Sequence, residues 1–254
     1  MQRVLQITDC HLVEAGQTLL GVNTQASLEA VLAQAKAQNV CDAVVASGDL
    51  VHEGSPAIYQ RFLNTLRRFF FDVPLLCLPG NHDVLANMRQ AQLPMQALTL
   101  GSWLIAPLDS HVDNQPSANI SPGDLKDLTE AMAKSNAKHL LMATHHPLVE
   151  IGAPWLDKDR ILRVEELMAV IAASPGANLR GTIFGHAHQE IEVTSEHGPL
   201  LGSPSTCFQF KPLSAQFTLD DRPPGYRWLS LAEDGSITTK LERLTAPSFK
   251  PTMN

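Results

Sequence analysis

The chain has 254 residues, of which 44% are hydrophobic and 18% are charged, and its formal net charge is −7. This length allows a sizeable core in one large α/β domain, and the composition is ordinary for a globular protein. The acidic balance and the lack of a basic block argue against partners such as nucleic acid or an anionic membrane. The chain contains no run of about 18 apolar residues, so no transmembrane helix is predicted.

Three strand–loop–helix units are predicted in the first third of the chain. Apolar strands at residues 3–7, 43–46 and 73–78 each end in polar residues, which are Asp9 and His11, Asp49, and Asn81-His82-Asp83. Helices are predicted to begin at Asn23 or Thr24 and at Ser55-Pro56, where serine caps the helix and proline takes its first position. Ligands in α/β folds bind at the carboxyl ends of strands, so these polar residues are candidates for a site.

The remaining chain repeats this scheme and then changes character. Strands are predicted at residues 103–108, 139–143 and 182–184, and helices from Ser121 and over residues 164–172. His145 and His146 follow the second of these strands, and His186 and His188 follow the third. Short apolar runs at residues 191–193, 200–202, 216–219, 228–231 and 237–241 predict antiparallel strands. This order of elements favours two packed sheets with helices outside, in a single domain over residues 1–254.

Cysteine usage indicates a cytoplasmic protein. Cys10, Cys41, Cys77 and Cys207 are widely spaced and form no C-x-x-C pair, so neither structural zinc nor a disulfide framework is expected. The first residues also lack the pattern of a signal peptide. Free thiols without an export signal fit a reducing compartment. Cys10 is expected to pack in the core, facing away from Asp9 and His11.

Seven polar residues at strand ends suit a metal centre: Asp9, His11, Asp49, Asn81, His145, His186 and His188. They are too many for one tetrahedral zinc, but fit two cations bridged by a carboxylate such as Asp49. Two metals about 3.5–4 Å apart favour in-line displacement at phosphorus, and a hydroxide held between them is the expected nucleophile. His82 is predicted to bind a phosphoryl oxygen or protonate the leaving oxygen. Asp83 is predicted to orient His82 or hold the loop.

The order of these motifs resembles a known family. Asp9-x-His11, Gly48-Asp49, Gly80-Asn81-His82-Asp83, His145-His146-Pro147 and Gly185-His186-x-His188 match the signature of calcineurin-like metallophosphoesterases. Stretches at residues 20–24, 154–157 and 204–212 also resemble the bacterial class III 3′,5′-cyclic AMP phosphodiesterases. With these stretches, the similarity covers nearly the whole chain.

The resemblance implies a four-layer α/β/β/α sandwich of two mixed sheets flanked by helices. It assigns one metal ion to Asp9, His11, Asp49 and His188, and the other to Asp49, Asn81, His145 and His186. It places His82 at the scissile phosphate, and His11, Asn81, His82 and His188 against the substrate. The implied metals are iron with manganese, or zinc, and the implied reaction converts cAMP to 5′-AMP. Relatives of this kind are often dimers, so this chain is expected to be a monomer or a homodimer.

Other interpretations stay open at this point. The same site would serve broader specificity for glycerophosphodiesters, 2′,3′-cyclic nucleotides or nucleoside monophosphates, and a degenerate member would act as a binding scaffold. His52 is expected on a solvated loop, and His146 as a packed neighbour of the site. His111, His139 and His197 are expected at the surface or at strand edges, and Asp157, Asp159 and Arg160 in a solvated run. Phe208, Phe210 and Phe217 are expected in the ordinary core, with stacking on a base or a subunit contact as the alternatives.

Overall fold

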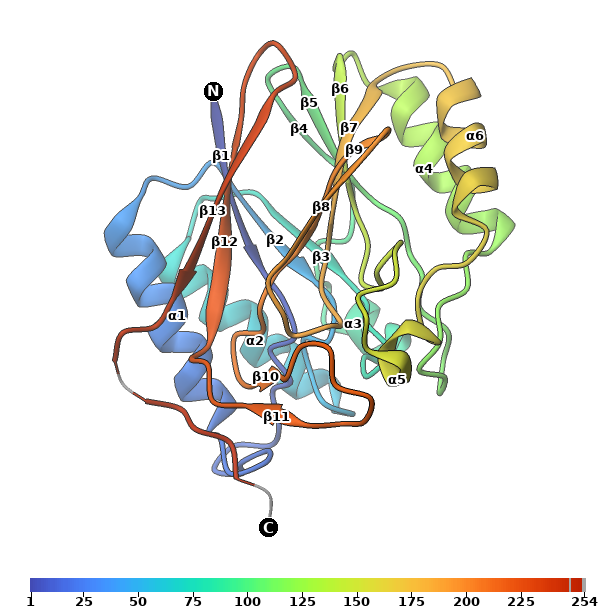
Figure 1. Ribbon diagram of the computed structural model, residues 1–254. Coiled ribbons are helices and arrows are strands. Elements are labelled where there is room, and N and C mark those ends of the chain that lie inside the picture. The colour runs from blue at the N-terminus through green and yellow to red at the C-terminus, as the bar shows by residue number, and fades with distance from the viewer. Residues whose placement is uncertain (247, 253–254) are drawn as a thin grey trace.

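The computed structural model describes residues 1–246 and 248–252. Two sheets pack face to face, and a layer of helices covers the outer face of each (Figure 1). This arrangement confirms the predicted four-layer sandwich of two mixed sheets.

The first sheet has five strands, in the order β13 (Ile237–Arg243), β12 (Gly225–Leu231), β1 (Gln2–Ile7), β2 (Ala43–Ser47) and β3 (Leu75–Leu78). Strands β1, β2 and β3 are parallel, whereas β12 runs antiparallel to both β1 and β13. Helices α1 (Thr24–Gln38), α2 (Pro56–Phe69) and α3 (Leu85–Gln90) lie on its outer side. Asn23 caps α1 by accepting a hydrogen bond from the Ala26 N–H, as the sequence predicted.

The second sheet has six strands, in the order β4 (Leu98–Leu100), β5 (Trp103–Pro107), β6 (His139–Ala143), β7 (Asn178–Phe184), β9 (Gly198–Gly202) and β8 (Ile191–Ser195). Helices α4 (Pro122–Lys134) and α6 (Val164–Ala173) cover it. Ser121 and Asp124 form a capping box at the start of α4, which confirms the predicted helix start.

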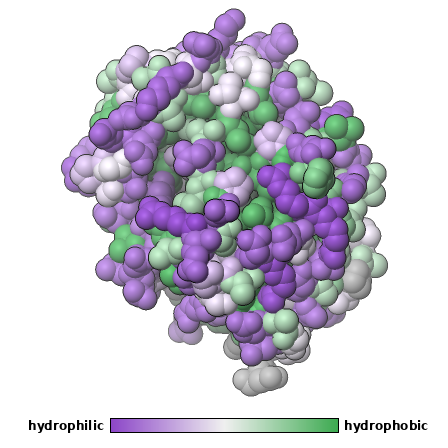
Figure 2. Space-filling model, turned by 180° about the vertical axis from the view of Figure 1, so that it is seen from behind, coloured by the Kyte–Doolittle hydropathy of each residue, from purple (hydrophilic) through white to green (hydrophobic). Residues whose placement is uncertain are grey.

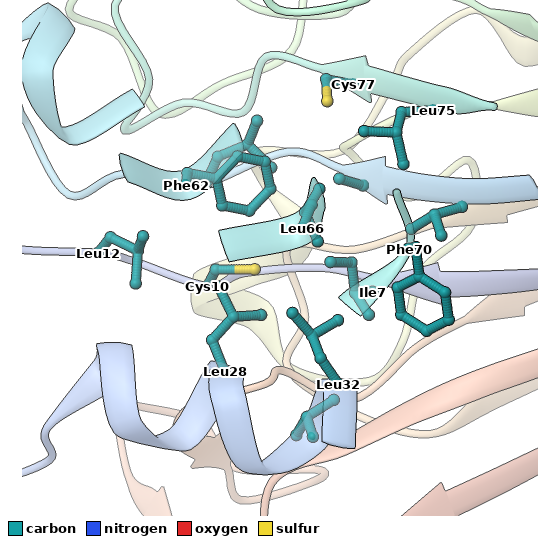
Figure 3. Close-up of a cluster of buried hydrophobic side chains, with 14 of the residues drawn as sticks. Ile7, Cys10, Leu12, Leu28, Leu32, Phe62, Leu66, Phe70, Leu75 and Cys77 are labelled. Carbon is teal, nitrogen blue, oxygen red and sulfur yellow. The ribbon is translucent and has the colours of Figure 1, made fainter. Parts of the chain in front are cut away.

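Three apolar clusters hold these four layers together. One lies between the sheets and includes Val45, Trp103 and Ile183. The other two join each sheet to its helices. Cys10 lies in the cluster under α1 and α2, with Leu28 and Leu66 nearby (Figure 3), so its predicted packing role is confirmed. Strand β1 ends at Ile7, however, and the alternation expected of a strand at Asp9, Cys10 and His11 does not occur.

Several elements differ from the sequence prediction. Strand β4, helix α3 and the four-residue helix α5 (Pro154–Asp157) were not predicted, because short elements carry too little periodicity to be recognised. The expected strand at residues 216–219 is wrong: β11 (Leu219–Asp220) begins only at its last residue and pairs with β10 (Gln209–Phe210). Strand β9 is antiparallel to β8 but parallel to β7, because the β8–β9 hairpin adds β9 beside β7.

The carboxyl ends of the parallel strands of both sheets meet at one end of the sandwich, which is the lower end in Figure 1. Helix α5 and the β10–β11 ribbon lie at this same end. Seen from behind, the surface is largely hydrophilic, with an apolar patch near its centre (Figure 2). Among the described residues, no helix is both long and apolar enough to cross a membrane.

Candidate active site

Asp49 occupies the centre of the cluster predicted from the strand ends. It follows β2 directly, and its backbone is left-handed, with φ of 51°. The preceding Gly48 has φ of +97°, and a Cβ there would collide with the His145 ring, so only glycine fits this turn. The Oδ2 atom of Asp49 lies 3.5 Å from Nε2 of His11 and 3.5 Å from Nε2 of His145. One carboxylate oxygen therefore faces two separate groups of ligand-type atoms.

The first group consists of Asp9, His11 and His188, together with Asp49. Nε2 of His11 lies 3.1 Å from Nε2 of His188, which in turn lies 3.4 Å from Oδ1 of Asp9. All these side chains are almost completely buried. The structure thus brings together the four residues that the sequence assigned to one metal ion.

The second group consists of Asn81, His145 and His186, again with Asp49. Oδ1 of Asn81 lies 3.2 Å from Nε2 of His145 and 2.9 Å from Nδ1 of His186. These residues come from the ends of β3, β6 and β7, so both sheets contribute. All seven predicted ligands are therefore adjacent in space.

The surroundings of the histidines fix the direction of their rings. Nδ1 of His145 lies 2.9 Å from the Ser47 carbonyl, and Nδ1 of His188 lies 2.7 Å from the Phe208 carbonyl. A carbonyl only accepts hydrogen bonds, so each Nδ1 carries a proton, and Nε2 is the atom that keeps its lone pair whenever the ring is neutral. Metal-binding histidines commonly have this arrangement. The converging lone pairs and carboxylates fit divalent cations, with no thiolate among them.

The backbone of the site is strained. Asp9, His11, Asp49, His186 and His188 all have φ between 43° and 63°. Residues other than glycine avoid this left-handed region, where each costs of order 1–3 kcal/mol and where functional sites are over-represented. The strain turns these side chains back towards one point immediately after each strand ends. This local conformation, rather than strand alternation, makes Asp9 and His11 converge.

Charge and burial act against each other at the site. Burial alone would lower the pKa of His145, but the charge of Asp49 and its hydrogen bond raise that pKa to about 9. Burial lowers the pKa of His186 well below its ordinary value, and the neighbouring His146 and His145 lower it further. The imidazole of His186 is therefore neutral near pH 7, which is the form that binds metal.

Asp83 holds the loop that carries Asn81 and His82. Its carboxylate accepts hydrogen bonds from the backbone N–H groups of Leu50, Val51 and Gly80 and from the Tyr59 hydroxyl. Burial and the charge of Asp49 raise its pKa to about 7, against the effect of these backbone donors. Of the two predicted roles for Asp83, these contacts fit holding the loop.

His82 stands at the mouth of the site. Its backbone N–H donates a hydrogen bond of 2.8 Å to Oδ1 of Asp49, while its half-buried ring faces a cavity of about 380 Å³. The polar residues that line the cavity include Asp49, Asn81, His82, His186 and His188, and its apolar residues are Leu19, Leu20, Trp155, Leu156, Phe208, Phe210 and Phe217. Phe210 stacks on His188, with 4.1 Å between ring centroids. Phe208 and Phe210 are buried in an apolar cluster, as expected of core residues, and also line this cavity, whereas Phe217, expected in the core, is 42% exposed.

Two further expectations from the sequence are wrong. His52 was expected on a solvated loop, but its half-buried ring lines the cavity and contacts His11 and His82. Asp159 was expected in a solvated run, but it is buried and accepts a hydrogen bond from Ser117. Asp157 likewise accepts one from the Ile151 N–H. The position of His52, three residues after Asp49, was the available signal, but loop geometry decides which way such a side chain points.

His146 is a packed neighbour of the site, as expected. It is completely buried, and its ring nitrogens lie 2.8 Å from the Ser110 hydroxyl and 2.9 Å from the Pro116 carbonyl. Burial, with the nearby charge of His145, lowers its pKa to about 3. A neutral His146 therefore supports the loop between β6 and the cavity.

Comparison with known proteins identifies the family. Residues 2–190 match the model of the calcineurin-like phosphoesterases, so the chain belongs to this family of metallophosphoesterases. The fold agrees: a purple acid phosphatase from yellow lupin (Lupinus luteus) superposes on 95% of this chain and 51% of its own, with a TM-score of 0.63 and 14% identity.

Two curated relatives are similar over nearly their full length. The 3′,5′-cyclic adenosine monophosphate phosphodiesterase CpdA of Escherichia coli (strain K12) is 38% identical over 98% of this chain and 92% of its own. The protein of the same name from Haemophilus influenzae is 37% identical, covering 99% of this chain and 93% of its own.

Proposed function

We propose that this protein hydrolyses the 3′,5′-cyclic phosphodiester of cAMP to 5′-AMP, using two metal ions held by the seven clustered residues. The observation that carries the proposal is the position of the Asp49 carboxylate between two sets of metal-ligand atoms. Relatives that share over a third of its sequence are named cAMP phosphodiesterases, which supports the choice of substrate.

Each set of residues has a distinct task in this proposal. Asp9, His11, Asp49 and His188 would hold one cation, and Asp49, Asn81, His145 and His186 the other. Bound there, two cations would lower the pKa of water to give a nucleophile and neutralise charge on the phosphoryl oxygens. The nitrogen and oxygen donors suit iron and manganese, and equally zinc.

His82 is the proposed catalytic residue. Its main-chain N–H donates a hydrogen bond to Asp49, but its ring nitrogens form no hydrogen bond with the described residues and face the cavity. The ring is therefore available to bind a phosphoryl oxygen and to donate a proton to the departing 3′ oxygen. Together with His11, Asn81 and His188, it would form the wall against which the phosphate rests.

The polar and apolar residues of the cavity match the two parts of a cyclic nucleotide. The phosphate carries the negative charge and belongs beside the metal ligands. The base is flat and largely apolar, and Phe210, which stacks on His188, packs edge to face with Trp155 and Phe217. Aromatic side chains of this kind commonly stack on bases. We further propose that the enzyme acts in the cytoplasm, because all four of its cysteines are free thiols.

The test is hydrolysis of 3′,5′-cAMP by protein reconstituted with manganese, with bis-(p-nitrophenyl) phosphate, 2′,3′-cAMP and glycerophosphodiesters in parallel. Asn81→Ala should abolish activity, whereas Asn64→Ala, on the exposed face of α2, should not change it. Conversion of cAMP to 5′-AMP supports the proposal. Turnover of the artificial diester without turnover of cAMP would leave the metal site intact and exclude cAMP as the substrate.

A further inference from the structure

His52 lines the cavity and contacts both a proposed metal ligand and the proposed catalytic histidine. Its Nδ1 lies 3.2 Å from Nδ1 of His11. Its ring also stacks on that of His82, with 4.5 Å between centroids and 28° between planes. Nothing in the motifs that define the family places a functional residue here.

The hydrogen bond to His11 has only one direction compatible with a bound metal. Nε2 of His11 faces Asp49 and His188, so it must keep its lone pair when a cation binds. The proton of a neutral His11 is then on Nδ1, and Nδ1 of His52 must accept it. For His145 and His188, backbone carbonyls accept the Nδ1 proton. His11 is the one of these three histidines whose Nδ1 proton is accepted by a side chain, which can be substituted.

The position of His52 is fixed by its own backbone. Its N–H donates to the Leu12 carbonyl beside His11, and the next N–H, of Glu53, donates to the His82 carbonyl. The loop is thus tied to both segments whose side chains it contacts. These backbone hydrogen bonds therefore hold the rings of His52 and His82 against each other.

We propose that His52 is a positioning residue with two separable tasks. Its Nδ1 accepts the His11 proton and so directs His11 Nε2 at the metal, and its ring supports the ring of His82. This inference rests on the proposed function, in which His11 is a ligand and His82 faces the phosphate. It adds a residue that neither the motifs nor the metal set includes.

Two substitutions separate the tasks. His52→Phe keeps a ring against His82 but removes the acceptor. His52→Asn keeps an acceptor, because its Oδ1 takes nearly the place of the imidazole Nδ1, but removes the ring. His197→Phe, on the β8–β9 hairpin, is the control. The measurements are the affinity of metal-stripped protein for Mn²⁺ by calorimetry, and kcat on bis-(p-nitrophenyl) phosphate at saturating Mn²⁺.

Opposite patterns are expected from the two variants. His52→Phe should bind one Mn²⁺ about 10–100-fold more weakly, as is typical when the partner of a ligand histidine is lost. His52→Asn should keep an affinity nearer that of the wild type but lose about two- to tenfold in kcat, the effect of one lost aromatic contact. At saturating Mn²⁺, His52→Phe should lose less in kcat than His52→Asn.

The outcomes are distinguishable from failure of the proposed function. A wild-type protein that binds no Mn²⁺ would overturn the metal site and this inference with it. A wild type that binds Mn²⁺ and cleaves the diester, with both variants changed alike or neither changed, would overturn this inference alone. Neither measurement involves cAMP, so the choice of substrate does not affect the result.

Discussion

The carboxylate of Asp83 provides the sharpest test of how this site is held. Oδ1 accepts hydrogen bonds from Val51 and Tyr59, and Oδ2 from Leu50 and Gly80, at distances of 2.9–3.1 Å. In Asp83→Asn one oxygen becomes an amide group, which donates and therefore faces two donors. The Tyr59 hydroxyl can turn to accept from an amide placed at the Oδ1 position, so the bond from the Val51 N–H is the one that such an amide must lose.

The expected cost follows from the lost bond and from the lost charge. A hydrogen bond to a charged group contributes about 1.5–3 kcal/mol, and the free energy of unfolding should fall by no more than this amount, because burial and Asp49 disfavour the ionised carboxylate and its removal acts in the opposite direction. Urea unfolding measures this at pH 8, above the Asp83 pKa of about 7, where the carboxyl is ionised. Activity should fall as well, because the loops that carry Asp49 and Asn81 lose their common anchor.

The control is Asp127→Asn on the exposed face of α4, which should change stability by less than about 0.5 kcal/mol. If Asp83→Asn costs less than about 1 kcal/mol and retains wild-type activity, then the carboxylate does not hold the loop, and the account of the site given above is wrong.

Three further predictions concern the cavity, the metal and pH. Phe217→Ala should reduce kcat/KM for cAMP by a factor corresponding to about 1–3 kcal/mol of stacking, but not kcat/KM for a glycerophosphodiester without an aromatic ring. The exposed Phe71 supplies the control, and an equal loss on both substrates would contradict a base-binding role. Mn²⁺ at about 100 times its dissociation constant should raise the free energy of unfolding by about 2.7 kcal/mol for each ion bound, and removal by a chelator should reverse this; Asn81→Ala, which loses a ligand of only one of the two ions, should show a smaller rise. His146 has a pKa of about 3 when folded and 6.5 as its ordinary value, so its contribution to stability is present above pH 6.5 and lost as pH falls towards 3. Between pH 7 and pH 5 the wild type should therefore lose about 2 kcal/mol more than His146→Gln in urea unfolding, and equal losses would show that His146 does not stay neutral.

The sequence by itself determined the class of fold and the members of the site. Strands with buried runs, helices with capped starts and polar residues at strand ends are local features that need no knowledge of the partner sheet. They sufficed to select Asp9, Asp49, Asn81 and the histidines proposed as ligands, because each lies just after a predicted strand. Short elements such as β4, α3 and α5 were missed because they carry no readable period.

Only the tertiary structure decided how side chains on loops point. His52 and Asp159 have nothing in their neighbouring sequence that distinguishes a solvated loop from a cavity wall. Their burial depends on residues far along the chain, such as His11 and Ser117. The same holds for Asp83, whose four donors come from three separate segments. Contacts between distant segments arise when two sheets pack, and the local pattern of the sequence does not encode them.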